Sequence, residues 1–237
     1  MKAMIFAAGL GTRLKPLTND KPKALVTVNG TTLLELTINK LIQHGFNEII
    51  INIHYFGNQI IDFLKSKNNF NISITISDES ELLLDTGGGL KKTAYFFNDN
   101  KPFLVHNVDI VSEINLTELY AQHLQSDAIA TLAVKNRKSS RYFIFDENLF
   151  LCGWKNEKTG ETVSANNNKP TFNLAFSGIH VLSPEIFNFI KDEGVFSITN
   201  SYLKIAATEK IKAYSHDDAF WMDAGTPESI KTLSERL

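Results

Sequence analysis

A loop near the N-terminus carries the side chains best suited to bind phosphate. It contains Gly9 and Gly11, the hydroxyl of Thr12 and the guanidinium of Arg13. Three further cations follow in the same loop, at Lys15, Lys21 and Lys23. Glycine lets the backbone approach phosphate oxygens closely, arginine can grip two oxygens at once, and lysine adds a point charge. This combination predicts binding of a triphosphate.

The loop differs from the two common phosphate-binding loops. The third glycine of a dinucleotide-binding fingerprint would fall at Leu14, and no Gly-Lys-Ser/Thr run occurs in the chain. The loop nevertheless follows an apolar segment, residues 2–7, and phosphates bind at that position in α/β proteins. An ordinary charged surface loop that uses glycine for its turns remains the alternative.

Two aspartates lie at positions where a metal ion could be held. Asp109 follows the apolar segment 103–107, and Asp223 follows the aromatic pair Phe220-Trp221 and precedes a glycine. Carboxylates at the ends of strands can share one Mg²⁺, which takes its other ligands from water and phosphate oxygens. Taken alone, an aspartate at a strand end is more often a helix cap or a turn former than a metal ligand.

Three consecutive glycines, Gly87 to Gly89, form an unusual cluster. Glycine disfavours both helix and strand, so the cluster predicts that a ligand or another backbone segment comes close. A flexible turn before a helix is the alternative interpretation.

Alternating strand and helix patterns must position these residues. The segment 2–7 reads as a strand, and a capping-box pattern at Thr32 and Glu35 opens a helix that ends near Gly45. The alternation continues through strands at 48–54, 72–77, 103–107 and 128–134 and helices at 56–66, 88–97 and 116–125. Such alternation predicts parallel strands joined by right-handed crossovers in a three-layer α/β/α sheet.

After about residue 137 the pattern becomes richer in β-structure. Segments 142–145 and 149–154 resemble a hairpin, and 172–182 reads as a long strand. Ser183-Pro184-Glu185 and Thr226-Pro227-Glu228 both have the form of a helix start. We expect a single domain over residues 1–237, with a nucleotide-binding half at 1–136 and a β-rich half, including the C-terminal helix, at 137–237.

Composition excludes several classes of protein. Lys and Arg number 24 against 26 Asp and Glu, giving a net charge of −2, and Cys152 is the single cysteine. A disulfide scaffold and a strongly basic nucleic-acid binder are therefore excluded. No apolar run approaches the length of a membrane span, and the apolar run at the N-terminus is too short for a secretory signal.

Several segments together resemble a known family. The run GLGTRLKPLTNDKPKAL, residues 9–25, is similar to the signature of the sugar-1-phosphate nucleotidyltransferases, which join a nucleoside triphosphate to a sugar phosphate and release pyrophosphate. Segments 84–90, 106–109 and 221–228 resemble the same family in the expected order. The resemblance implies a Rossmann-like mixed sheet of the nucleotide-diphospho-sugar transferase type, with a small β-rich portion that binds the acceptor.

The resemblance also implies roles for individual residues. It implies a catalytic role for Arg13, Lys23 and Asp109, and Mg²⁺ held by Asp109 and Asp223. The implied nucleotide-binding residues are Ala7, Ala8, Gly9, Gly11, Thr12, Arg13, Thr86, Gly87 and Asn107. The implied sugar-phosphate-binding residues are Lys23, Asn156, Asn173, Ser177 and Gly178. One departure is Val108, where the family usually has a glycine, because valine does not tolerate a positive φ.

This sequence, which has the compact length of a single domain, most closely resembles two branches of the family. These are the uridylyltransferases that act on N-acetylmuramate 1-phosphate with UTP, and the mannose-1-phosphate guanylyltransferases that use GTP. A phosphocholine cytidylyltransferase and a non-catalytic regulatory homologue are the alternatives; retention of the four charged site residues counts against the latter. The resemblance further implies a cytoplasmic monomer or small homo-oligomer that binds neither nucleic acid nor membrane.

Overall fold

The computed structural model describes residues 1–237 as two compact units, each built from separate stretches of the chain. The first unit comprises Met1–Leu84, Val105–Leu116 and Phe220–Leu237, and the second comprises Asp85–Leu104 and Thr117–Ala219. The C-terminal helix, expected in the later half, belongs to the first unit, so the units do not follow a single division at residue 136. None of the helices combines the length and the hydrophobicity needed to cross a bilayer.

A parallel sheet forms the centre of the first unit. Strand β1 (Lys2–Phe6) pairs with β4 (Glu48–Ile53), which pairs with β5 (Ser73–Asp78), all in parallel. Strand β6 (Phe103–Asn107) is the other neighbour of β1. The apolar runs of β1 and β4 are fully buried because both faces of such a sheet are covered. The predicted α/β fold is confirmed, and the observed strand bounds lie within two residues of the expected ones.

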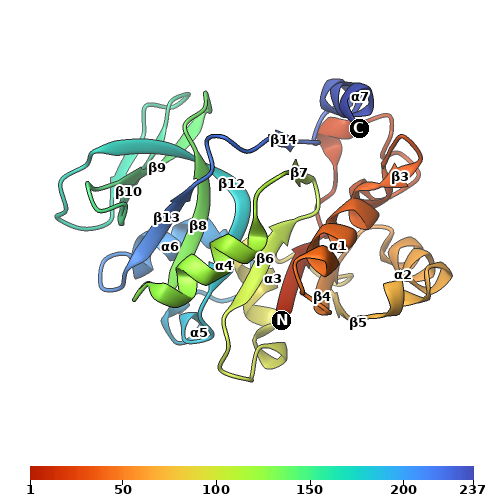
Figure 1. Ribbon diagram of the computed structural model, residues 1–237, viewed down its shortest axis with the longest axis horizontal. Coiled ribbons are helices and arrows are strands. Elements are labelled where there is room, and N and C mark those ends of the chain that lie inside the picture. Colours follow the sequence, from red (N-terminus) through yellow and green to blue (C-terminus); the bar gives the residue numbers. More distant parts are fainter. The chain divides into compact units, whose positions relative to one another are not determined.

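Helices α1 (Leu33–Gln43) and α2 (Gly57–Ser66) connect these strands (Figure 1). The hydroxyl of Thr32 accepts a hydrogen bond from the backbone N–H of Glu35 at 3.1 Å, which caps α1 as the sequence predicts. Gly45 follows the helix with a φ of 80°, the left-handed conformation that ends many helices. The 3₁₀ turn η3 (Asn68–Asn71) leads from α2 to β5.

A short antiparallel ribbon brings the end of the chain back to the first unit. Strand β7 (Ile110–Ser112) pairs with β14 (Trp221–Asp223), and helix α7 (Pro227–Arg236) follows (Figure 1). Thr226 and Ser229 cap α7 reciprocally. The glycine-containing loop forms the 3₁₀ turns η1 (Thr12–Leu14) and η2 (Lys23–Leu25) and the hairpin β2 (Thr27–Val28) and β3 (Thr31–Thr32).

One apolar cluster joins the loop to the C-terminal helix. It consists of Leu14, Val26, Val28, Leu33, Ala224, Ile230 and Leu233. All seven side chains are at least nine-tenths buried. The cluster therefore holds the N-terminal loop and the segment after β14 side by side, which places their charged residues within reach of one another.

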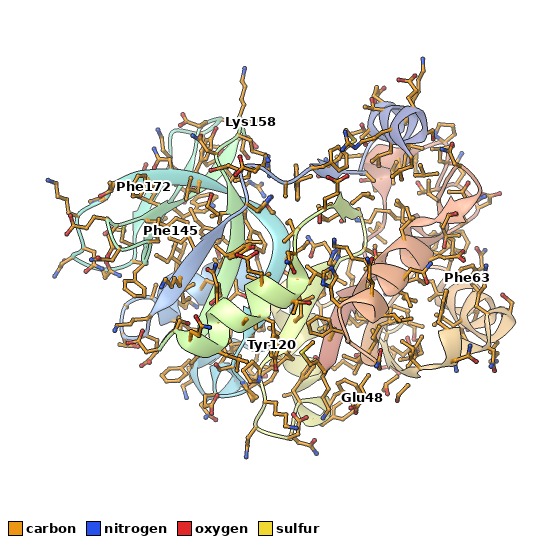
Figure 2. The ribbon with its side chains drawn as sticks, in the orientation of Figure 1. Glu48, Phe63, Tyr120, Phe145, Lys158 and Phe172 are labelled. Carbon is orange, nitrogen blue, oxygen red and sulfur yellow. The ribbon has the colours of Figure 1, made fainter.

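The second unit is mainly antiparallel. Its strands run in the order β13 (Ile211–Ser215), β8 (Ala130–Lys135), β12 (Phe172–Leu182), β9 (Arg141–Phe145), β10 (Leu151–Asn156) and β11 (Thr162–Ser164). Only the β13–β8 pair is parallel. The register of β12 against β8 shifts between Phe176 and His180, where Gly178 has a φ of 73°. Phe145 is buried in β9, whereas Phe172 lies at the exposed start of β12 (Figure 2).

The helices of the second unit differ in part from those expected. Helix α3 (Asp85–Lys92) begins three residues before the predicted start and contains the glycine cluster, and the 3₁₀ turn η4 (Ala94–Phe96) follows. Helices α4 (Leu116–Gln125), α5 (Ile186–Phe189) and α6 (Ile198–Ile205) complete the unit. Helix α5 is a single turn without a side-chain cap, because the hydroxyl of Ser183 instead lies 3.0 Å from Nε2 of His123.

Candidate active site

Lys23 and Asp109 form a largely buried ion pair in the first unit. Nζ of Lys23 donates to Oδ2 of Asp109 at 2.8 Å, and their side chains are 15% and 10% exposed. Asp109 follows β6, as predicted, and the preceding Val108 donates its backbone N–H to the carbonyl of Phe6. Val108 is fully buried and has no positive φ, so valine fits where the resemblance led us to expect glycine.

Arg13 and Asp223 form a second pair, which is more exposed. Nη2 of Arg13 lies 3.5 Å from Oδ2 of Asp223. The backbone N–H of Gly225 donates to Oδ1 of the same aspartate at 2.7 Å. A Cβ at Gly225 would lie 2.5 Å from that Oδ1 and 2.6 Å from Nη2 of Arg13. A side chain at 225 would therefore displace Arg13 or Asp223 from the positions they have in this pair.

The two aspartates lie on adjacent segments. Asp223 is paired with Ile110 in the β14–β7 ribbon, and the N–H of Ala224 donates to the carbonyl of Asp109 at 2.7 Å. No group of three or more His, Cys, Asp or Glu side chains in the chain could hold a metal ion by itself. Two carboxylates next to a glycine-containing loop rich in cations fit Mg²⁺, which completes its shell with water and phosphate oxygens.

The two glycines of the loop have different structural environments. Gly11 has a φ of 64°, and a Cβ there would lie 3.0 Å from Cγ2 of Thr18 and 3.1 Å from Cβ of Lys23. Gly9 has no positive φ, and its nearest neighbour would be Nζ of Lys23 at an ordinary 3.4 Å. The protein itself therefore requires glycine at 11 but not at 9, where the end of the flexible Lys23 side chain is the nearest group.

A pocket of about 360 Å³ lies beside the loop. It is lined by Leu10, Thr12, Lys15, Thr18, Asn19 and Tyr55. The exposed hydroxyl and ammonium groups of Thr12 and Lys15 give this pocket the chemistry to receive an anion.

The N–H of Ala7 is already engaged. It donates to Oδ1 of Asn52 at 2.8 Å, and Asn52 in turn donates to the buried carboxylate of Glu79. Neither Asn52 nor Glu79 was predicted from the sequence to have a role. The only local signal was one polar residue within the apolar strand β4.

Thr86 and Gly87 have structural roles within the second unit. The hydroxyl of Thr86 accepts from the backbone N–H of Ile198, and the N–H of Gly87 donates to the carbonyl of Phe196 at 2.9 Å. A Cβ at Gly87 would lie 2.8 Å from that carbonyl and 2.4 Å from the ring of Phe196. Of the two explanations predicted for the glycine cluster, close approach of another backbone segment is the one present at Gly87.

The residues expected to bind the sugar phosphate have varied surroundings. Asn173 is exposed on β12, and Oδ1 of Asn156 accepts from the N–H of Lys158 in a turn. Ser177 is fully buried and its hydroxyl lies 2.7 Å from Nε2 of His216. Ser177 therefore offers no surface to a ligand, contrary to expectation, because this part of β12 lies in the interior.

Asn107 and His106 lie directly before the Asp109 turn. Nδ1 of His106 lies 2.8 Å from the carbonyl of Asn107. Burial lowers the pKa of His106 from its ordinary 6.5 to about 4. This histidine is therefore neutral near pH 7, so the charges of the site come from the two cation–carboxylate pairs.

Comparison with known proteins relates this geometry to a family. The nucleotidyl transferase family model matches residues 2–237. An N-acetylmuramate alpha-1-phosphate uridylyltransferase of Neisseria meningitidis is 31% identical over 98% of this chain and 96% of its own length. Mannose-1-phosphate guanyltransferase 2 of Candida glabrata is 30% identical over 97% of this chain, which spans 63% of that longer protein.

A solved structure has the same fold. The crystal structure of HddC from Yersinia pseudotuberculosis superposes with a TM-score of 0.79, at 25% identity, covering 99% of this chain and 98% of that one. Both the sequence matches and the fold extend over almost the whole chain. The protein therefore belongs to the sugar-1-phosphate nucleotidyltransferases of the nucleotidyl transferase family.

Proposed function

We propose that this protein transfers uridine monophosphate from UTP to N-acetylmuramate 1-phosphate, releasing pyrophosphate. The observation that carries the proposal is the pairing of two loop cations, Arg13 and Lys23, with two aspartates on adjacent segments. The choice of substrates is supported by similarity to a uridylyltransferase of nearly the same length.

The reaction requires no nucleophile from the protein. A phosphate monoester has a second pKa near about 6, so a sugar 1-phosphate is largely dianionic at neutral pH and its oxygen can attack the α-phosphorus directly. The P–O bond to the β-phosphate breaks as the new bond forms, and pyrophosphate leaves. The protein must then position the two substrates and neutralise their charge.

The loop cations are arranged for this task. Arg13 is 64% exposed and free to grip the departing phosphates in a fork. Nζ of Lys23 pairs with Asp109 and lies 3.4 Å from where a Cβ on Gly9 would stand, so the same ammonium is within reach of a phosphate bound beside Gly9. Asp109 and Asp223 would hold Mg²⁺, which supplies further charge neutralisation to the triphosphate when bound.

A pyrophosphate-release assay tests the proposal. It crosses UTP, GTP, CTP and ATP with the 1-phosphates of N-acetylmuramate, mannose and glucose and with phosphocholine. We expect the highest kcat/KM for UTP with N-acetylmuramate 1-phosphate. No release with any pair would favour the non-catalytic alternative, and release with CTP and phosphocholine would identify a cytidylyltransferase.

Aspartate variants test the metal ligands. Asp109→Asn and Asp223→Asn should each lower kcat by at least about 100-fold, because charge stabilisation at the reacting phosphates is lost. Asp20→Asn, an exposed aspartate of the same loop, is the matched control. Activity near that of the wild type in Asp109→Asn would overturn the metal assignment.

Guanylyl transfer to mannose 1-phosphate is the second candidate. It is favoured by the similarity to the Candida glabrata guanyltransferase, which covers 97% of this chain. The same assay separates the two candidates, because they differ in both nucleotide and sugar.

A further inference from the structure

Two buried polar side chains lie under the start of the glycine-containing loop. Asn52, on β4, is 3% exposed, and Glu79, directly after β5, is 1% exposed. A buried carboxylate destabilises a protein unless its oxygens are fully hydrogen-bonded. The groups that hydrogen-bond to Asn52 and Glu79 therefore indicate the role of these two side chains.

The pair makes a directional series of hydrogen bonds. The N–H of Ala7 donates to Oδ1 of Asn52 at 2.8 Å, and Nδ2 of Asn52 donates to Oε1 of Glu79 at 2.8 Å. The backbone N–H of Leu84 donates to Oε2 of Glu79 at 3.0 Å. A backbone N–H can only donate, so the amide of Asn52 has one possible orientation and Glu79 must accept on both oxygens.

Glu79 is itself held in place through its backbone. Its N–H donates to the carbonyl of Ile53 at 2.8 Å, and its carbonyl lies 2.7 Å from Nδ1 of His54. The carboxylate is thus anchored to β4 at a defined position. The two backbone N–H groups that end the series, those of Ala7 and Leu84, are positioned relative to this anchor.

Both of these backbone groups belong to segments next to predicted nucleotide contacts. Ala7 is followed directly by Ala8 and Gly9, and the ammonium of Lys23 lies beside Gly9. Leu84 is followed by Asp85, the first residue of α3. An apolar pair could fill the same volume but would leave the buried N–H of Ala7 and the partly buried N–H of Leu84 without acceptors, and an unsatisfied buried donor is more costly than the loss of a typical hydrogen bond.

We propose that Asn52 and Glu79 are positioning residues for nucleotide binding, which act by fixing the backbone at Ala7 and Leu84. This inference rests on the proposed function for its kinetic consequence. The pair touches no substrate. The Asn52–Glu79 pair should chiefly affect the KM for the nucleoside triphosphate, because the pair fixes the position of the loop backbone before the substrate binds.

An exchange of amide and carboxylate between the two positions tests the proposal. In Asn52→Asp, two carboxylates face each other and neither can donate. In Glu79→Gln, the new NH₂ group must face another donor, either the amide of Asn52 or the N–H of Leu84. In the double variant Asn52→Asp/Glu79→Gln, the new carboxylate accepts from Ala7 and from the new amide, whose carbonyl accepts from Leu84. The double variant alone restores every hydrogen bond.

We expect each single variant to raise the KM for the triphosphate by about tenfold, the effect of one broken buried hydrogen bond, with a smaller change in kcat. The double variant should return to within about threefold of the wild-type KM. Glu81→Gln, an exposed glutamate two residues further on, is the matched control and should leave the KM unchanged. Single variants with a wild-type KM, or a double variant no better than the worse single, would overturn the proposal.

Amide hydrogen exchange provides a readout that does not depend on catalysis. The amides of Ala7 and Leu84 should exchange faster in both single variants and regain protection in the double variant. Should Asn52→Asp fail to fold, Glu79→Gln and the double variant carry the comparison. A wild-type protein that is inactive with every combination of substrates would refute the proposed function. In that case, amide hydrogen exchange and triphosphate binding would still decide whether Asn52 and Glu79 position the backbone.

Discussion

Gly9 is a residue whose small size is not required by the protein around it. Its backbone has no positive φ, and an added Cβ would make only ordinary contact with the end of the flexible Lys23 side chain. Gly9→Ala should therefore leave thermal stability unchanged or slightly raised, by about 0.4–1 kcal/mol, through the lower entropy of the unfolded chain. Triphosphate binding, measured by calorimetry, should weaken by at least about tenfold if a phosphate occupies the space above Gly9.

Gly11→Ala is the natural comparison within the same loop. Here the φ of 64° and the crowding by Thr18 and Lys23 disfavour any side chain. This variant should lose about 1–2 kcal/mol of folding free energy even without substrate. A Gly9→Ala variant that behaves like Gly11→Ala, with lower stability and no separate effect on binding, would contradict the ligand-based explanation of Gly9.

Gly225 affects the site through the Arg13–Asp223 pair. Gly225→Ala should push apart the two side chains, because the new Cβ would lie within 2.6 Å of charged atoms of both. The expected result is a higher Mg²⁺ concentration for half-maximal pyrophosphate release, with little change in the thermal midpoint because Arg13 is exposed and can move. An unchanged Mg²⁺ dependence would show that the position of Asp223 does not matter.

Single residues of the site were predictable to different degrees. Arg13 and Lys23 could be singled out because cations in a glycine-containing loop suit phosphate, whereas Asp109 and Asp223 needed the family resemblance, since a strand-end aspartate alone is more often a cap or a turn former. The burial of Ser177 could not be predicted, since it follows from the place of β12 inside the sheet, between β8 and β9, which no local pattern reveals. Asn52 and Glu79 were missed because their pairing joins residues 27 positions apart.

Helix α3 is the element in which local preference and tertiary packing conflict most clearly. Alanine is favoured over glycine in a helix by about 1 kcal/mol, so Gly87→Ala should stabilise α3 in isolation. In the folded protein, the new Cβ would collide with the carbonyl and the ring of Phe196. We expect a net loss of about 1–3 kcal/mol, measured by urea unfolding.

A second substitution separates the two contacts at Gly87. Phe196→Ala removes the ring but leaves the carbonyl, 2.8 Å from the added Cβ. The double variant Gly87→Ala/Phe196→Ala should therefore show no recovery relative to Phe196→Ala alone. If Gly87→Ala proved stabilising in either background, the glycine would have to be explained by a ligand instead.

The regular elements of the fold were predictable because each is specified by a local pattern. Strand β6 and helix α4 have the expected bounds, and α1 has the expected cap. The β7–β14 ribbon was missed, since its three-residue strands lie more than 100 residues apart and have no distinctive periodicity. This ribbon places Asp223 beside Asp109, so the sequence predicted the two carboxylates but not the element that brings them together.

At the scale of the molecule, the change to a β-rich sequence pattern near residue 137 reveals only part of how the chain is organised. It marks a β-rich stretch that does lie in the second unit, but the chain returns to the first unit at Phe220. The apolar cluster that anchors this return combines Leu14 and Val26 of the loop with Ile230 and Leu233 of α7. Such a cluster cannot be recognised before both segments are placed, because each contributes only a few apolar residues.

Three buried histidines give the whole protein a predictable response to acid. Burial lowers the pKa of His106, His123 and His216 from the ordinary 6.5 to about 4, with the nearby charge of Lys135 adding to the effect at His216. These side chains are neutral in the folded protein but take up protons below pH 6.5 when the chain unfolds. Stability is therefore complete above about pH 6.5 and falls as the pH drops toward 4.

The expected loss is large compared with the stability of a typical domain. A shift of this size corresponds to about 3 kcal/mol for each histidine at the acid end, against a total of about 5–15 kcal/mol. Urea unfolding between pH 7.5 and 4.5 should show a falling midpoint, and His123→Gln should flatten the slope. His123 is the best position for this test because both ring nitrogens contact hydroxyls, of Thr131 and Ser183, so an amide retains a partner. A midpoint independent of pH from 7 to 5 would mean that the buried histidines are accommodated in their charged form.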